Sequence, residues 1–353
     1  MNEGDPGGPD SRESATTSLR VLQVVGDTDA TDSALGALGL HAAWVARSVE
    51  VRTFAIAPGR RRGLEQAIPV LAPGRRSITA HTQFRREARW ADVVVLHGTP
   101  AALVAALATP RESAALVFAV DPSIEQPSDR PLPSRLIRLG ARLAGVVNTD
   151  PTAASGVASR LGTAAPVATI PTGVDLVRTP VGDDERRAAR SALGLADTTA
   201  PIVRSIGASA EELTTLRSAV EALGGHWIDG RVDPDIARAA ADVVAAPTAG
   251  PTGPPRALLL AAHAGSAVVA PDVGALADLV DSRTGAPCGR DEPSIRSALS
   301  TLSDPHRRAA AGAEASARVV RSFGLADVGD RWIDLLRMVA ATPESAGGSD
   351  PGS

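Results

Sequence analysis

A histidine stands where a short apolar stretch ends, a position at which α/β proteins commonly bind ligands. His97 closes the stretch WADVVVLH, and Asp121 follows the next apolar stretch, Ala114–Val120. A short continuous apolar run is typical of a parallel strand buried on both faces, and ligands bind at the carboxyl ends of such strands. The position makes His97 a candidate to face a ligand. A histidine that serves only the packing of the core is the alternative.

The elements that would position such groups are clearest between residues 241 and 280. Ala241–Pro247 predicts a buried strand, and a loop rich in glycine and proline follows it. An apolar helix, Arg256–Ala264, ends at Gly265 and leads to a second buried strand, Ala267–Ala270. Strand, helix and strand form a βαβ unit, whose strands are parallel and whose ligand crevice lies at their carboxyl ends.

The same alternation of strands and helices extends over the rest of the chain, which at 353 residues is long enough for two domains. A helix from about Ser33 to Arg47 follows the loop after Gly26. The other expected strands are Leu19–Val25, Val49–Ile56, Trp90–His97, Ala114–Val120, a short one before Asn148, and Pro201–Gly207. This pattern predicts an α/β fold with doubly wound parallel sheets.

Composition argues against several classes of protein. The formal net charge is −4 and the chain has no lysine, so a general nucleic-acid binder is not expected. One cysteine, Cys288, excludes an intramolecular disulfide and a cysteine-clustered zinc site. Residues 1–18 lack the order of a signal peptide, and no apolar run reaches the roughly 18–20 residues of a membrane span. We expect a cytoplasmic protein with disordered tails at 1–18 and 342–353.

Arginines crowd into the thirty residues from 60 to 89, where the only balancing acids are Glu65 and Glu87. They are Arg60, Arg61, Arg62, Arg75, Arg76, Arg85, Arg86 and Arg89. A solvated surface is the preferred explanation. The alternative is an anionic partner, either an acidic acceptor or a weak peripheral contact with an anionic inner membrane face through Arg60–Arg62, Arg75–Arg76 and Arg85–Arg86.

The βαβ unit resembles the nucleotide-sugar site of family 4 GT-B glycosyltransferases. Two further segments, RVLQVVG at 20–26 and VATIPTGVD at 167–175, resemble the family's first strand and its passage between domains. The matching frame of the unit is Ala241-Asp242-Val243, Pro247, Gly253, Ala261, Gly265, Val268-Val269-Ala270 and Asp272-Val273-Gly274. The resemblance implies two Rossmann-like domains facing a cleft, and transfer of a sugar from a nucleotide sugar with retention, without metal or cofactor.

The resemblance also implies where the domains and the site lie. The acceptor-side domain spans 19–180, the donor-side domain 181–324, and a helix at 325–341 crosses back to the first domain. The link between Glu221 and Asp233 is short, so the second domain is expected to lack about one βα unit. The implied site residues are His97 and Asp121 as catalytic groups, Gly207, Thr252, Gly253, Arg256, Asp272 and Gly274 for the donor, and Gly26, Asp32 and Ser33 on the acceptor side.

The donor site departs from the family pattern. Thr252 and Leu260 stand where the family has two glutamates, and neither the arginine nor the lysine that holds the diphosphate follows Gly207. Pro254 and Pro255 have no N–H to offer a phosphate. Two hypotheses stay open: a glycosyltransferase with a divergent site, and a catalytically inactive homologue that acts as a binding or protein-partner module. A Rossmann oxidoreductase is rejected because no G-x-G-x-x-G follows a strand.

Overall fold

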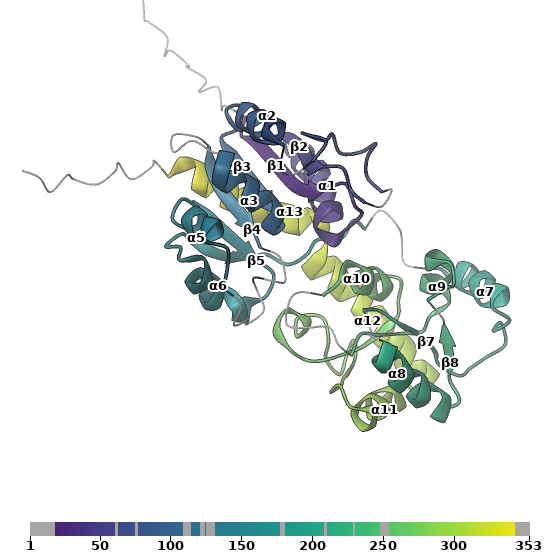
Figure 1. The fold of residues 1–353 in the computed structure, drawn as a ribbon. Helices are drawn as coiled ribbons and strands as arrows, with labels where there is room; N and C mark the ends of the chain where they lie inside the picture. Colours follow the sequence, from purple (N-terminus) through teal and green to yellow (C-terminus); the bar gives the residue numbers. More distant parts are fainter. Residues whose placement is uncertain are drawn as a thin grey trace, which may run out of the picture.

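The computed structural model describes residues 18–60, 63–74, 77–108, 114–120, 124, 131–176, 181–207, 210–228, 230–247 and 254–342. The two tails that we expect to be disordered lie outside these residues, apart from Ser18 and Thr342. Within them the chain folds into two α/β domains, the first at the upper left of Figure 1 and the second at the lower right.

A parallel sheet of six strands, in the order β2-β1-β3-β4-β5-β6, forms the centre of the first domain. The chain passes from β1 out to β2 and resumes on the other side of β1 with β3, so the strand order reverses between β1 and β3. The strands are β1 Arg20–Asp27, β2 Glu50–Ala57, β3 Val93–His97, β4 Ala115–Ala119, β5 Gly145–Asn148 and β6 Val167–Thr169. Open α/β sheets bind ligands at such a reversal.

Helices cover both faces of this sheet, which explains why its strands are apolar throughout. Alternate residues of one strand enter different cores: Val93 and Val95 face α1, whereas Val94 and Leu96 face α2 and α3. The helices of this domain are α1 Asp32–Val45, α2 Ile78–Ala88, α3 Gly98–Ala108, α5 Ser134–Gly140 and α6 Ala154–Leu161, with a short 3-10 turn, η1, at Pro151–Ala153.

The second domain holds a parallel sheet of five strands in the order β11-β10-β9-β7-β8, reversing between β7 and β9. α10 and α12 cover one face, and α8 and α11 cover the other. The strands are β7 Ile202–Ser205, β8 His226–Ile228, β9 Val243–Ala245, β10 Ala267–Ala270 and β11 Gly285–Pro287. The helices are α7 Asp183–Ala192, α8 Ala210–Ala222, α9 Pro234–Ala240, α10 Arg256–His263, α11 Glu292–Thr301 and α12 Pro305–Phe323, with the 3-10 turn η2 at Gly274–Leu276.

The second sheet has one strand fewer than the first. The loss of about one βα unit relative to the family stays a prediction. The short link between Glu221 and Asp233 nevertheless contains a strand, β8, of three residues. α9 follows it with seven residues. Both elements escaped the sequence analysis because they are too short to show a hydrophobic period.

The chain crosses between the domains twice, and the two crossings pair with each other. Val174, on the way out, bridges Gly324, on the way back. The Val174 N–H donates to the Phe323 carbonyl at 2.9 Å, and the Leu325 N–H donates to the Val174 carbonyl at 3.0 Å. Both segments are thereby held together at one place.

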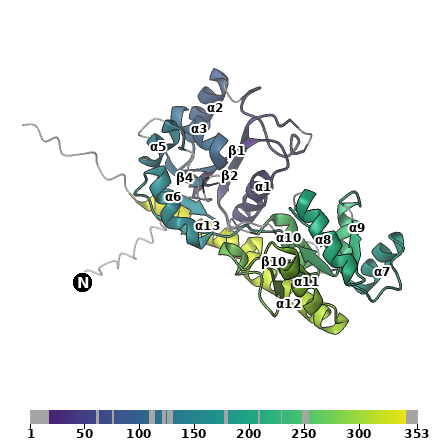
Figure 2. The ribbon, with the colours of Figure 1, turned by 60° about the horizontal axis from the view of Figure 1, so that its bottom comes forward.

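The last helix, α13 (Leu325–Ala341), returns to the first domain and packs on its sheet beside α1 (Figure 2). Trp332, Leu335, Leu336 and Val339, which the sequence places on one helix face, are all buried there. The Trp332 ring lies 5.8 Å from the ring of Trp44 on α1. The return helix therefore completes the core of the first domain.

Candidate active site

Two contacts bring the carboxyl ends of the two sheets together, and we call this region the domain junction. The loop after β1 leads to Asp32, which bonds Arg256 at the start of α10. The turn η1, after β5, contacts the turn η2, after β10. The junction therefore lies at the strand ends of both sheets, where α/β domains bind ligands.

The first contact joins two residues that the sequence analysis had assigned to opposite sides of the site. Oδ2 of Asp32, in the first turn of α1, accepts the backbone N–H of Arg256 at 3.3 Å. Pro255 precedes α10 and provides no side-chain cap, so a carboxylate of the other domain takes that place. The guanidinium of Arg256 donates to the carbonyl of Gly173, in the crossing segment, at 3.4 Å.

The remaining predicted residues surround these two or lie outside the described part of the chain. Gly26 is the last residue but one of β1. Ser33 follows Asp32 on α1 and is exposed. Gly207 follows β7 with a φ of 71°, and Gly274 opens η2 with a φ of 53°. Asp272 is exposed between β10 and η2. Asp121, Thr252 and Gly253 lie outside the described residues.

Two further side chains bear on how a nucleotide diphosphate could be held. Arg204, on β7 shortly before Gly207, donates to the Pro234 carbonyl at 3.3 Å and is thus directed toward α9. Burial and the neighbouring Arg238 lower the pKa of its guanidinium. Leu260, which replaces a family glutamate, packs against the core of the second domain. Arg256, the first residue of α10, therefore places a guanidinium at the domain junction.

His97 is a buried residue in a chain of hydrogen bonds. Its Nε2 lies 2.9 Å from Oε1 of Gln23, in the middle of β1. The amide nitrogen of Gln23 donates to the Ala37 carbonyl at 3.1 Å and to Oγ1 of Thr53 at 3.3 Å. Nδ1 of His41 lies 3.0 Å from the same Thr53 hydroxyl. Sequence analysis missed Gln23, although a glutamine inside an apolar strand is itself a signal.

Burial controls the charge of His97. Desolvation lowers the pKa of its imidazole from 6.5 to about 4. The imidazole also lies against the ring of Trp332, with 6.2 Å between the ring centroids. His97 is therefore neutral at physiological pH. It can donate and accept hydrogen bonds but carries no positive charge.

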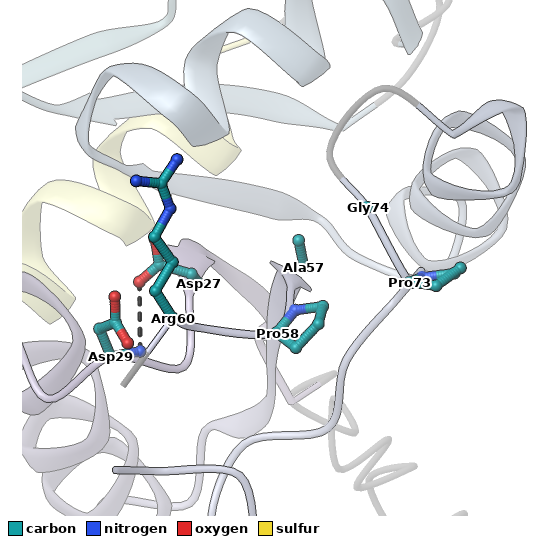
Figure 3. Close-up of a pocket in the computed structure, with 7 residues that line it drawn as sticks. All are labelled: Asp27, Asp29, Ala57, Pro58, Arg60, Pro73 and Gly74. Atoms are coloured by element: carbon teal, nitrogen blue, oxygen red, sulfur yellow. Dashed lines mark hydrogen bonds between the residues drawn. The ribbon is translucent and has the colours of Figure 1, made fainter. Parts of the chain in front are cut away.

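A cavity of about 610 Å³ opens at the ends of β1 and β2 (Figure 3). One side carries Asp27, Asp29 and Arg60, and the far side is formed by Pro73 and Gly74. Oδ1 of Asp27 accepts the backbone N–H of Asp29 at 3.2 Å, which shapes the loop. This volume suits a small ligand. The sequence analysis named neither Asp27 nor Asp29 as a site residue.

The described residues contain no group of three or more side chains placed to hold a metal ion. Within the same part of the chain, no helix has the length and apolar character needed to span a membrane.

The predicted arginine cluster is only partly described. Arg60 lines the cavity, whereas Nε of Arg85 donates to the Ala108 carbonyl at 2.5 Å and so serves the end of α3. Arg86 is exposed on α2, and Arg61, Arg62, Arg75 and Arg76 lie outside the described residues. The anionic-partner alternative stays a prediction.

The whole fold is similar to solved glycosyltransferases. Anabaena HepE in complex with UDP-glucose gives a TM-score of 0.71 at 16% identity, over 91% of this chain and 100% of HepE. Sucrose-phosphate synthase from Thermosynechococcus elongatus gives 0.63 at 16% identity, over 92% and 99% of the two chains. WaaG, a glycosyltransferase involved in lipopolysaccharide biosynthesis, gives 0.59 at 16% identity, over 90% and 99%.

No protein-family model matches the sequence, and no curated protein sequence matches it. At identities of 16% the likeness defines the fold, and it extends over nine-tenths of the chain. That fold is the GT-B fold, with two facing parallel-sheet domains, as the sequence predicted.

Proposed function

We propose that the protein is a glycosyltransferase that transfers a sugar from a nucleotide-sugar donor with retention of anomeric configuration. One observation carries the proposal: both domains together match HepE, whose structure holds UDP-glucose. A GT-B protein works by binding donor and acceptor between two domains, so a likeness confined to one domain would carry less weight. The proposed reaction uses no metal and no cofactor.

The donor site in this proposal is the start of α10. Helix N-termini attract phosphate because their first N–H groups lack partners within the helix. Arg256 adds a guanidinium at the same place, and Gly207, Thr252, Gly253, Asp272 and Gly274 complete the predicted donor side. The Arg256 N–H donates a hydrogen bond to the carboxylate of Asp32. This contact supports an anion-binding role for the start of α10.

The acceptor site in this proposal is the cavity at the ends of β1 and β2, with Gly26, Asp32 and Ser33 beside it. Asp27, Asp29 and Arg60 offer both acceptors and donors of hydrogen bonds to a hydroxyl-bearing ligand, and Pro58 and Pro73 offer apolar surface. His97 and Asp121 are proposed to contact the transferred sugar. The mixed lining supports an acceptor that carries hydroxyl groups.

An inactive homologue that binds a ligand or a protein partner is the second candidate. The packing of Leu260 into the core supports it, because no carboxylate is available there for the ribose of a nucleotide. The missing lysine and family arginine support it further. Such a homologue would retain the GT-B fold but would not catalyse sugar transfer.

Thermal unfolding with a panel of nucleotide sugars, UDP-glucose first, tests the two candidates. A transferase is expected to be stabilised by one donor and, with that donor and an acceptor, to release the nucleotide. Proton NMR of the product reports whether the anomeric configuration is retained. Stabilisation by no donor would reject the transferase, and binding without any nucleotide release over a range of acceptors would favour the inactive homologue.

A cytoplasmic location with weak contact to an anionic membrane face is proposed as a separate point. Arg86 on α2 and Arg89, just after this helix, are exposed and support it. Co-sedimentation with vesicles containing an anionic lipid is expected to exceed that with neutral vesicles and to weaken as salt rises. Equal recovery with both kinds of vesicle would reject the membrane contact.

A further inference from the structure

Gln23 is a wholly buried polar residue in the middle of an otherwise apolar strand. A buried amide without hydrogen bonds costs roughly 1–3 kcal/mol in proteins, so its partners decide whether it is tolerated. Gln23 uses both ends of its amide, which bond three different elements: α1, β2 and β3. The pattern of these bonds has a consequence for His97.

The Ala37 carbonyl determines which way the amide of Gln23 points. A carbonyl accepts hydrogen bonds and never donates them, so the Gln23 atom 3.1 Å from it must be the nitrogen. The second hydrogen of that nitrogen goes to Thr53. The amide oxygen is then the atom that faces Nε2 of His97, at 2.9 Å.

An amide oxygen accepts only, so Nε2 of His97 must carry the hydrogen. Burial keeps the imidazole neutral, since it lowers the pKa to about 4. A neutral imidazole with hydrogen on Nε2 has none on Nδ1. Nδ1 is therefore the acceptor nitrogen of His97.

We propose that Gln23 is a positioning residue, which holds His97 as the neutral Nε2–H tautomer so that Nδ1 can accept a hydrogen bond from a sugar hydroxyl. The sugar-binding part rests on the proposed glycosyltransferase function, whereas the tautomer does not. Gln23 touches no substrate, and an amide does not pass protons on. Its role is to hold the tautomer and the ring orientation of His97.

The same network joins His97 to the helix that enters the domain junction. α1 carries Asp32 at its start, the Ala37 carbonyl in its second turn, and His41 beyond it. His41 meets the Thr53 hydroxyl, which also receives the amide hydrogen of Gln23. A change at Gln23 is therefore expected to affect His97 first and the placement of α1 second.

The test is nitrogen NMR of the histidine side chains in the whole protein labelled with ¹⁵N-histidine at neutral pH. The chain has six histidines, and His97→Gln identifies the signals of His97. Wild-type His97 is expected to show Nε2 with hydrogen and Nδ1 without. Gln23→Leu is expected to convert it to a mixture of tautomers, and the matched change Gln83→Leu, on α2, is expected to leave it unchanged. Circular dichroism checks that each variant is folded.

An Nδ1–H tautomer in the wild type, or an unchanged His97 tautomer in folded Gln23→Leu, would overturn the proposal. If Gln23→Leu does not fold, Thr53→Val replaces it, because it removes one partner of the amide and is expected to increase exchange between the His97 tautomers. UDP-glucose titrations separate the two proposals. Loss of about one hydrogen bond predicts about five-fold weaker binding in Gln23→Leu than in Gln83→Leu. If neither the wild type nor any variant binds any nucleotide sugar of the panel, while the tautomers are as expected, the proposed function is rejected and the positioning role stands.

Discussion

Oδ2 of Asp32 lies 3.3 Å from the backbone nitrogen of Arg256, although the two residues are 224 positions apart. The carboxylate belongs to the first domain and the helix start to the second. A negative group thus occupies the helix end at which a nucleotide diphosphate is proposed to bind. The contact also ties the domains together at the junction.

Replacing Asp32 is expected to strengthen donor binding. Asp32→Ala removes a negative charge that competes with the diphosphate for the Arg256 N–H. An exposed charge-assisted contact of this kind is worth about 0.5–1 kcal/mol, so UDP-glucose is expected to bind about two- to five-fold more tightly. Isothermal calorimetry measures this, with Ser33→Ala as the neighbouring control. Weaker binding in Asp32→Ala would mean that Asp32 holds the donor and does not oppose it.

Replacing Arg256 is expected to weaken donor binding. Arg256→Ala removes the guanidinium of the first residue of α10 and keeps the helix backbone. A charge-assisted hydrogen bond contributes about 1.5–3 kcal/mol, which corresponds to about 10- to 150-fold in affinity. Calorimetry with UDP-glucose compares it with Arg337→Ala, an exposed arginine on α13. Equal affinities in both variants would place the diphosphate elsewhere.

The low pKa of His97 predicts a loss of stability in mild acid. The pKa is 6.5 in the unfolded chain and about 4 in the folded one, so the unfolded state binds more protons between these values. Stability therefore falls as the pH drops from about 6.5 toward 4, by up to about 3 kcal/mol. Urea unfolding at about pH 7.5 and pH 4.5 measures the loss, which His97→Gln is expected to reduce. The exposed His306→Gln should behave as the wild type, and an equal loss in all three proteins would contradict the assignment.

Asp242 is expected to be a major contributor to the stability of the second domain. Its Oδ1 accepts from Arg190 at 2.5 Å and its Oδ2 accepts the Ile202 N–H at 3.0 Å, with the side chain 15% exposed. Asp242→Ala leaves these groups without their acceptor and is expected to cost about 3 kcal/mol in urea unfolding.

The matched control for Asp242 is Asp184→Ala. This change breaks the ion pair between Asp184, whose side chain is 97% exposed, and Arg187. That change is expected to alter the free energy of unfolding by less than about 1 kcal/mol. A similar loss in both variants would show that burial of the Asp242 contacts contributes little.

Much of the fold could be predicted because local sequence patterns identify its strands and helices. The βαβ unit expected at 241–270 appears as β9, α10 and β10, within two residues of the predicted ends. Short elements such as β8 were missed, since three residues carry no measurable period. Resemblance to a family then supplied the two-domain arrangement, which the comparison with solved structures confirms.

The candidate site was less predictable, and the reason differs from residue to residue. Asp32 and Arg256 were named from the sequence, but nothing in it indicated that they meet. Gln23 carried a signal, a polar residue in an apolar strand, whose meaning depends on partners at Ala37, Thr53 and His97. The cavity is formed by loops after two strands, and Pro73 and Gly74 had no feature that would connect them with Asp27.

By itself, the sequence determined the order of strands and helices, the apolar faces and the absence of lysine, because these follow from local pattern and composition. Only the tertiary structure decided that Asp32 reaches the N–H of Arg256 and that Gln23 directs its oxygen at His97. Such contacts depend on side chains brought within about 3 Å by the packing of elements that lie far apart in the chain. No local pattern encodes a distance of that kind, and the chemistry of the site depends on it.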